Sequence, residues 1–238
     1  MFPLDWFCLF LLALSLQCGP VGKSHNQEMD SQPMSQINTN ALSPIVPETI
    51  SPFSLAVAVQ GGQIYLGRGR ELLVFEKRGA SRPTLRGHLV LEGEVRDIVA
   101  VEHVVYLAVL GSGLVIVDVA DPSQLHITGF LKLPLAEGLD IESSRAYVAV
   151  REEGLVIIDV TDSNELIELG RYQTPEGALK VCVRDKLAYV AASYAGMRIL
   201  DINDPAKVSE VGFATRGSYG QGSVWGIAVS GNRAYSAI

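Results

Sequence analysis

The chain has 238 residues, of which 48% are hydrophobic and 19% charged, so it holds enough apolar material for one or two packed domains. Its formal net charge of −7 at pH 7 argues against a nucleic-acid-binding protein, because neutralising phosphates requires a surplus of Lys and Arg. We therefore expect no nucleic-acid partner.

Residues 1–18 are dominated by an apolar run from Trp6 to Leu16. The run is shorter than the roughly 20 residues that span a bilayer, and it suits the apolar region of a secretory signal peptide. Asp5 and the lack of a preceding Lys or Arg leave an uncleaved anchor or a different start codon as alternatives, and Cys18 leaves lipidation open. We predict a signal peptide over residues 1–18, a secreted or cell-surface protein, and no membrane span after cleavage.

Residues 19–50 are rich in Gln, Ser, Asn and Pro and show no apolar period, which predicts a flexible linker. The folded part is then expected over residues 51–238. Of the three cysteines only Cys182 lies there, so we expect no internal disulfide and a small buried core residue at this position.

A short apolar run that starts at a Gly and ends at an Asp repeats along residues 51–238. Its copies begin at Gly113, Gly154 and Gly196, which lie 41 and 42 residues apart, a period typical of repeat architectures. Val and Ile fill consecutive positions, which predicts a strand buried on both faces. The Gly suits a turn with positive φ, and an Asp-x-x-Asp pair ends each strand.

Three further features recur around this run and predict three more strands per repeat. A Tyr stands seven residues before each Gly, an alternating apolar pair precedes the Tyr, and a segment containing a Gly follows the Asp pair. The tyrosines are Tyr65, Tyr106, Tyr147, Tyr189 and Tyr235, and the later glycines are Gly87, Gly129, Gly170 and Gly212. Four short antiparallel strands in about 41 residues predict a β-propeller blade.

Two copies of the run carry a family signature: Leu114–Asp118 reads Leu-Val-Ile-Val-Asp, and Leu155–Asp159 reads Leu-Val-Ile-Ile-Asp. They resemble the LVIVD-repeat family of β-propellers over roughly residues 54–238. The resemblance implies an all-β fold, here a partial propeller of about four four-stranded antiparallel blades plus the start of a fifth. Glu76 replaces the Asp in the first copy, and Arg198 interrupts a later one, where we expect it to meet solvent or an acidic neighbour.

Members of this family typically close with six or seven blades, so we interpret the chain as a truncated member. The alternative is that another copy completes the ring. An open arc exposes blade edges, which predicts possible self-association through them.

The segments that join one blade to the next are the expected ligand site, because propeller ligands usually meet loops around the central channel. We predict loops over 92–97, 136–140, 175–180 and 216–225. The binding candidates in these loops are Arg96, Glu137, Glu176, Tyr219 and Trp225, the last two because aromatics on a Gly-rich loop are typical anchors.

The leading hypothesis is an extracytoplasmic or cell-surface scaffold that binds a protein or glycan without catalysis. The alternative is a metal-assisted propeller hydrolase of the lactonase or esterase kind, with Glu94, Glu137 and Glu176 as ligands. We expect no cofactor; Ca²⁺ at the repeated Asp pairs is the competing interpretation to a turn-forming role. These pairs are Asp118/Asp121, Asp159/Asp162 and Asp201/Asp204.

Overall fold

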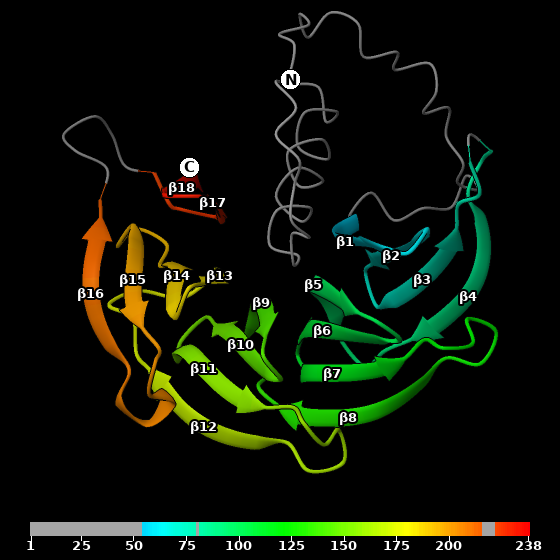
Figure 1. Cartoon of the computed structure of the whole chain (residues 1–238), viewed down its shortest axis with the longest axis horizontal. Coiled ribbons are helices and arrows are strands. Elements are labelled where there is room, and N and C mark those ends of the chain that lie inside the picture. Colours follow the sequence, from blue (N-terminus) through cyan, green and yellow to red (C-terminus); the bar gives the residue numbers. More distant parts are fainter. Residues whose placement is uncertain (1–53, 80, 216–221) are drawn as a thin grey trace, which may run out of the picture.

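The computed structural model describes residues 54–79, 81–215 and 222–238, and β-strands dominate them (Figure 1). The predicted signal peptide, the predicted linker and Tyr219 lie outside these residues. Within the described part of the chain, no helix has both the length and the apolar character that crossing a membrane requires.

The strands form four complete blades and a final pair. Blade 1 holds β1 (Ser54–Gln60), β2 (Gln63–Arg68), β3 (Glu71–Glu76) and β4 (Thr84–Val90). Blade 2 holds β5 (Glu94–Val101), β6 (Val104–Leu110), β7 (Gly113–Asp118) and β8 (His126–Lys132). Blade 3 holds β9 (Ala136–Glu142), β10 (Arg145–Val150), β11 (Gly154–Asp159) and β12 (Ile167–Tyr172). Blade 4 holds β13 (Lys180–Arg184), β14 (Leu187–Ala191), β15 (Met197–Asp201) and β16 (Ser209–Ala214), and β17 (Gly226–Ser230) pairs with β18 (Arg233–Ala237).

Each blade is an antiparallel sheet whose strands pair in chain order. Figure 1 shows the blades following one another along an arc, with the first strand of each complete blade innermost and the fourth outermost. The all-β partial propeller predicted from the repeats is therefore confirmed.

The repeated apolar run forms the third strand of its blade, and its burial explains its composition. In β7 and β11 the first five residues are all buried, because neighbouring blades cover both faces of the sheet. Gly113 and Gly154 begin these strands with φ of 144° and 83°, values that residues with a Cβ rarely adopt.

The core consists of apolar layers between successive blades rather than of one central cluster. One layer joins blades 1 and 2, a second joins blades 2 and 3, and a third joins blades 3 and 4. A fourth layer packs blade 4 against β17, and Cys182 is fully buried in it, as predicted. Each blade thus depends on its neighbour for burial, as in other repeat proteins.

The two departures from the repeat pattern are both accommodated by ion pairs. Glu76 contacts the guanidinium groups of Arg78 and Arg86 at 2.8 and 2.7 Å. Arg198 Nη1 lies 3.3 Å from Glu210 Oε1, and its guanidinium carbon lies 5.2 Å from the centre of the Phe213 ring. The expectation of an acidic neighbour for Arg198 is confirmed.

The predicted inter-blade loops are partly wrong. Arg96 and Glu137 lie on the innermost strands β5 and β9, and Lys180 begins β13. Polar residues occur at the start of these strands because they form ion pairs between blades, Arg96 with Glu137 and Lys180 with Asp97, so the apolar alternation used to place the strand starts is interrupted there. Glu176, by contrast, precedes β13 in a connecting segment, as predicted.

Candidate functional site

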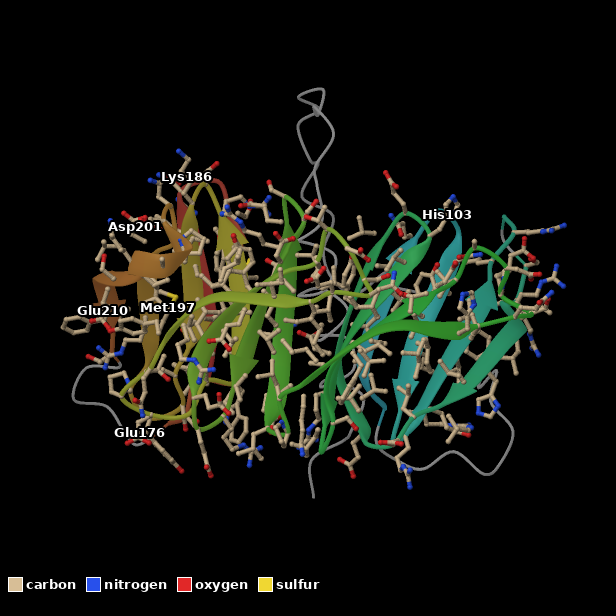
Figure 2. All side chains as sticks on the ribbon, turned by 90° about the horizontal axis from the view of Figure 1, so that it is seen from below. His103, Glu176, Lys186, Met197, Asp201 and Glu210 are labelled. Atoms are coloured by element: carbon tan, nitrogen blue, oxygen red, sulfur yellow. The ribbon has the colours of Figure 1, made fainter. Side chains whose placement is uncertain are left out.

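The blades present two faces that differ in which connections they carry. We call one the connection face: it holds the turns between second and third strands and the segments that join blades. We call the other the Asp-turn face: it holds the remaining hairpin turns, including those that follow the third strands. Figure 2 shows Glu176 toward the connection face and His103, Lys186 and Asp201 toward the Asp-turn face.

The repeated aspartates on the Asp-turn face accept hydrogen bonds from nearby backbone N–H groups. Asp118 Oδ1 accepts from Ala120 N at 2.8 Å, and Asp121 Oδ1 accepts from Ser123 N at 2.9 Å. The pairs Asp159/Asp162 and Asp201/Asp204 repeat this pattern two residues ahead. These bonds fix the turns and lower the pKa of Asp121, Asp159 and Asp162, with side-chain or backbone donors as the main cause.

In blades 2, 3 and 4 the turn after the third strand also packs against the preceding blade. A Cβ at Gly87 in β4 would overlap the carbonyl oxygen of Pro122, and one at Gly170 in β12 would overlap that of Pro205. Gly129 in β8 stands in the same relation to Ser163. The recurrent Gly of the fourth strand and the recurrent Asp turn are therefore two sides of one inter-blade joint.

The inner strands carry a partly buried ion pair that bridges blades. Lys180 Nζ lies 2.5 Å from Asp97 Oδ2, across the intervening Gly138 of blade 3. A side chain at Gly138 would collide with Leu179 and Lys180, so the glycine opens the path for the lysine. The same Asp97 oxygen accepts the Leu139 N–H at 2.7 Å, which joins β5 to β9.

Asp140 makes the corresponding link between blades 3 and 4. Its Oδ2 accepts the Val183 N–H at 2.7 Å, and its Oδ1 accepts the Ile141 N–H at 2.9 Å. Burial raises the pKa of Asp140 to about 7, against the opposing effect of these two N–H donors and of Lys180. Asp140 as a whole is only 3% exposed, so we assign its carboxyl group to the joint between blades 3 and 4.

Arg96 and Glu137, two of the predicted binding residues, contact each other. Arg96 Nε lies 3.2 Å from Glu137 Oε2, and Glu137 Oε1 forms an ion pair with Arg151. The Glu137 side chain is only 9% exposed, while Glu94 contacts Arg96 from the exposed side at 3.7 Å. The structure thus brings together four residues in a charge cluster that joins the blades: Glu94 and Arg96 from blade 2, and Glu137 and Arg151 from blade 3.

The hydrolase alternative requires acidic side chains that converge on one metal ion. Glu137 and Glu176 do not fit that role. Glu137 is neutralised by two arginines, and Glu176 is exposed on a separate segment. Among the described residues, no three His, Cys, Asp or Glu side chains are arranged to hold a metal ion.

Trp225, another predicted binding residue, lies on the connection face, as does Tyr194 in the turn between β14 and β15. Trp225 is 62% exposed and Tyr194 is 71% exposed. The Val224 N–H donates to Ser193 O at 3.0 Å, and the Ser193 and Ser223 hydroxyl groups lie 2.9 Å apart. These contacts hold the segments carrying the two aromatics side by side.

The backbone of Trp225 is anchored on its other side as well. Its N–H donates to Ala237 O of β18 at 2.9 Å. The proximity of the segments that carry Tyr194 and Trp225 depends on the contact between Ser193 and Ser223, which lie 30 positions apart, so no local motif predicts it. The signal in the sequence was limited to an aromatic in each of two turns that share a face.

Known structures share this fold. The crystal structure of a protein from Lactobacillus plantarum matches with a TM-score of 0.61 and 13% identity, over 70% of this chain and 57% of that one. The computationally designed Ika8 protein gives a TM-score of 0.59 at 11% identity, over 77% and 54%. The designed Ika4 protein gives 0.51 at 11% identity, over 67% and 92%. The chain therefore spans little more than half of two of these proteins.

A search of the curated proteins finds no match. The family model described as the LVIVD repeat matches residues 92–131, 139–174, 177–215 and 221–238, which together are more than half of the chain. Blade 1 lies outside these matches, yet it has the same four strands, its Tyr65 and its Gly87. On the strength of its repeats and its blades, the chain belongs to the LVIVD repeat family.

Proposed function

We propose that this protein is a non-enzymatic binding scaffold, secreted or held at the cell surface, that presents its connection face to a protein or glycan ligand. The observation that carries the proposal is the exposed pair Tyr194 and Trp225. Large aromatics are the residues most enriched at binding hot spots, and they lose little conformational entropy on binding.

The rigidity of this pair supports a binding role over that of two incidental surface residues. Both aromatics are attached to backbone that is hydrogen-bonded to other segments, so the backbone that carries the exposed rings is already positioned before a ligand arrives. The surrounding charges of the connection face are largely paired, as in the Arg96 cluster and in Arg68 with Glu71 at 2.5 Å. An apolar anchor within a polar surround is the usual anatomy of a binding surface.

The experiment compares binding of the purified full chain and of Trp225→Ala and Tyr194→Ala to a glycan array and to immobilised extracellular protein fractions. We expect each substitution to weaken binding to the same ligand by about tenfold or more, a loss typical of a hot-spot residue. Phe130→Ala is the matched control, because Phe130 is a similarly exposed aromatic on the outer strand β8. Equal binding by all four proteins contradicts the proposal.

The location is tested separately, by the intact mass of the protein recovered from cells and from the medium. Export with cleavage after about residue 18 removes roughly 2 kDa. Full-length protein confined to the cytosol contradicts the surface or secreted role and leaves the binding test unaffected.

A further inference from the structure

The interface between blades 2 and 3 contains a cavity of about 310 Å³ on the Asp-turn face. Its polar lining comes from both blades and consists of His103, Tyr106, Asp118, Thr128, Thr161 and Ser163. Ile116 and Val160 supply apolar surface. Figure 2 shows His103 on the face opposite to Glu176, so the cavity is distinct from the connection face.

One position of blade 2 that lines the cavity differs from its equivalents in the other blades. Thr128 directly precedes the joint glycine of its blade, and the same position holds Arg86 in blade 1, Leu169 in blade 3 and Val211 in blade 4. Arg86 reaches across to Glu76, whereas Leu169 packs into the layer between blades 3 and 4. The shorter threonine fills neither space, and it leaves Tyr106 partly exposed where Tyr147 is buried.

A second departure faces the first across the same interface. Ser163 occupies the turn position at which blades 2 and 4 have Pro122 and Pro205. Both changes replace a bulky or apolar residue with a hydroxyl group, and both line the one cavity. Two independent departures from the repeat therefore make this interface hollow and polar.

Several polar groups around the cavity are available to a ligand. Within the described part of the chain, the side chains of His103, Tyr106 and Ser163 make no hydrogen bond to another protein group. Asp118 uses Oδ1 for the Ala120 N–H, while the nearest partner of its Oδ2 is His126 Nε2 at 3.8 Å. The lining thus offers a carboxylate acceptor, hydroxyl groups that donate or accept, and an aromatic ring.

We propose that this cavity binds a neutral monosaccharide unit. Its volume lies at the lower end of small-molecule sites, and its combination of an aromatic and apolar floor with few converging polar groups is typical of them. A sugar supplies many hydroxyl groups, which match mixed donors and acceptors. Asp118 is the only carboxylate in the lining, and it disfavours phosphate or another anion.

The test is saturation-transfer NMR of the purified full chain with glucose, galactose, mannose and N-acetylglucosamine, each at millimolar concentration. We expect transfer to at least one sugar, and loss of that transfer in Thr128→Leu, which fills the cavity with the side chain found at Leu169. Val211→Leu, at the equivalent and exposed position of blade 4, is the matched control and should leave the transfer unchanged. A melting temperature of Thr128→Leu at or above that of the parent shows that the loss does not reflect unfolding.

Three results overturn the inference: no transfer to any of the four sugars, unchanged transfer in Thr128→Leu, or transfer that disappears in Trp225→Ala. The last result would place the sugar on the connection face and would support the proposed function instead. Conversely, transfer that survives Trp225→Ala but not Thr128→Leu supports the cavity, whatever the outcome of the connection-face experiment.

Discussion

Asp140 is a single residue that makes the stability of the fold depend on pH. Its carboxyl group is removed from solvent at the inner edge of blades 3 and 4, and burial raises its pKa to about 7. In the unfolded chain an Asp titrates near pH 3.9. The folded state therefore binds more protons between these two values, and the stability contributed by Asp140 falls as the pH rises from about 4 to about 7.

We predict that the parent protein loses about 2–3 kcal/mol of unfolding free energy between pH 5 and pH 8 relative to Asp140→Asn. The measurement is the pH slope of urea unfolding for each protein, so that the variant's own stability cancels. Asp121→Asn is the control, because hydrogen bonds lower the pKa of Asp121 and its titration lies below this range. Identical slopes for the parent and Asp140→Asn would show that Asp140 stays ionised throughout.

Most of the residues that sequence reasoning could place are those that recur in every repeat. The tyrosines, the third-strand glycines and the Asp pairs were all assigned to the strands or turns that they occupy. Asp97 and Asp140 were not recognised as inter-blade contacts, because the strand positions equivalent to Asp97 hold Gly138 and Lys180. A contact that occurs once, between residues about 42 positions apart, leaves no period to detect.

At the level of the strand, the joint between a fourth-strand glycine and the following Asp turn is the clearest determinant of blade packing. We predict that Gly170→Ala lowers the unfolding free energy by about 1–3 kcal/mol, because the new methyl group overlaps the backbone of Pro205, which cannot move as a side chain can. Chemical denaturation measures the change.

Gly212→Ala in β16 is the matched control for this prediction. It is the same substitution at the equivalent position, but the nearest atom to the new methyl group is Ile199 Cδ1 at 3.6 Å, an ordinary contact. We expect its stability to stay within about 0.5 kcal/mol of the parent. Equal losses in both variants would attribute the effect to strand conformation rather than to the joint.

The hairpin turn between β9 and β10 is a second element whose backbone conformation affects the unfolding free energy. Ser143 and Ser144 adopt φ of 50° and 59°, and the flanking Glu142 and Arg145 are paired. Both residues occupy the left-handed region that the two central positions of a type I′ turn require, and Asn-Gly is the preferred pair there. Serine is held in this conformation at a cost of about 1 kcal/mol or more.

We predict that the double substitution Ser143→Asn and Ser144→Gly raises the unfolding free energy by about 1–2 kcal/mol. Glu165→Gly is the control, because it introduces a glycine at an exposed turn residue that does not have positive φ. That change should lower stability slightly through the greater freedom of the unfolded chain. Thermal unfolding of both variants separates the two effects.

Across the whole molecule, burial is distributed between blades, so local stability should follow the layers. The strands β6, β7, β10 and β11 lie between complete neighbours and contribute to apolar layers on both of their faces. The outer strands β4, β8 and β12 are largely exposed on alternate residues. We predict the slowest amide exchange in the first group and markedly faster exchange in the second, as measured by hydrogen–deuterium exchange with mass spectrometry.

Uniform protection across a blade would contradict this prediction and would mean that each blade opens as a unit. The comparison is internal to blades 2 and 3, so it needs no variant. Exchange in β14 and β15, which face β17 on one side, gives an intermediate reference.

The fold of the molecule was predictable because the repeat determines it, whereas the candidate sites depend on departures from the repeat. Thr128 and Ser163 carry no signal on their own. Their role in lining a cavity is recognised only when the blades are packed and the equivalent positions are compared. The same holds for Tyr194 and Trp225, whose proximity depends on the contact between blade 4 and β17. The residues that recur in every repeat thus indicate the fold, and the residues that depart from the repeat indicate the candidate sites.

The joint between glycine and Asp turn has a consequence for how such a chain grows. The fourth-strand glycine of blades 1, 2 and 3 accepts the turn of the next blade, so blades 2 and 3 each carry both halves of the joint. A tandem duplication of one repeat therefore brings both halves of the joint with it, and the new blade meets compatible surfaces on each side. Arrays of this kind can gain or lose a blade through recombination in a single event, without compensating substitutions elsewhere in the gene.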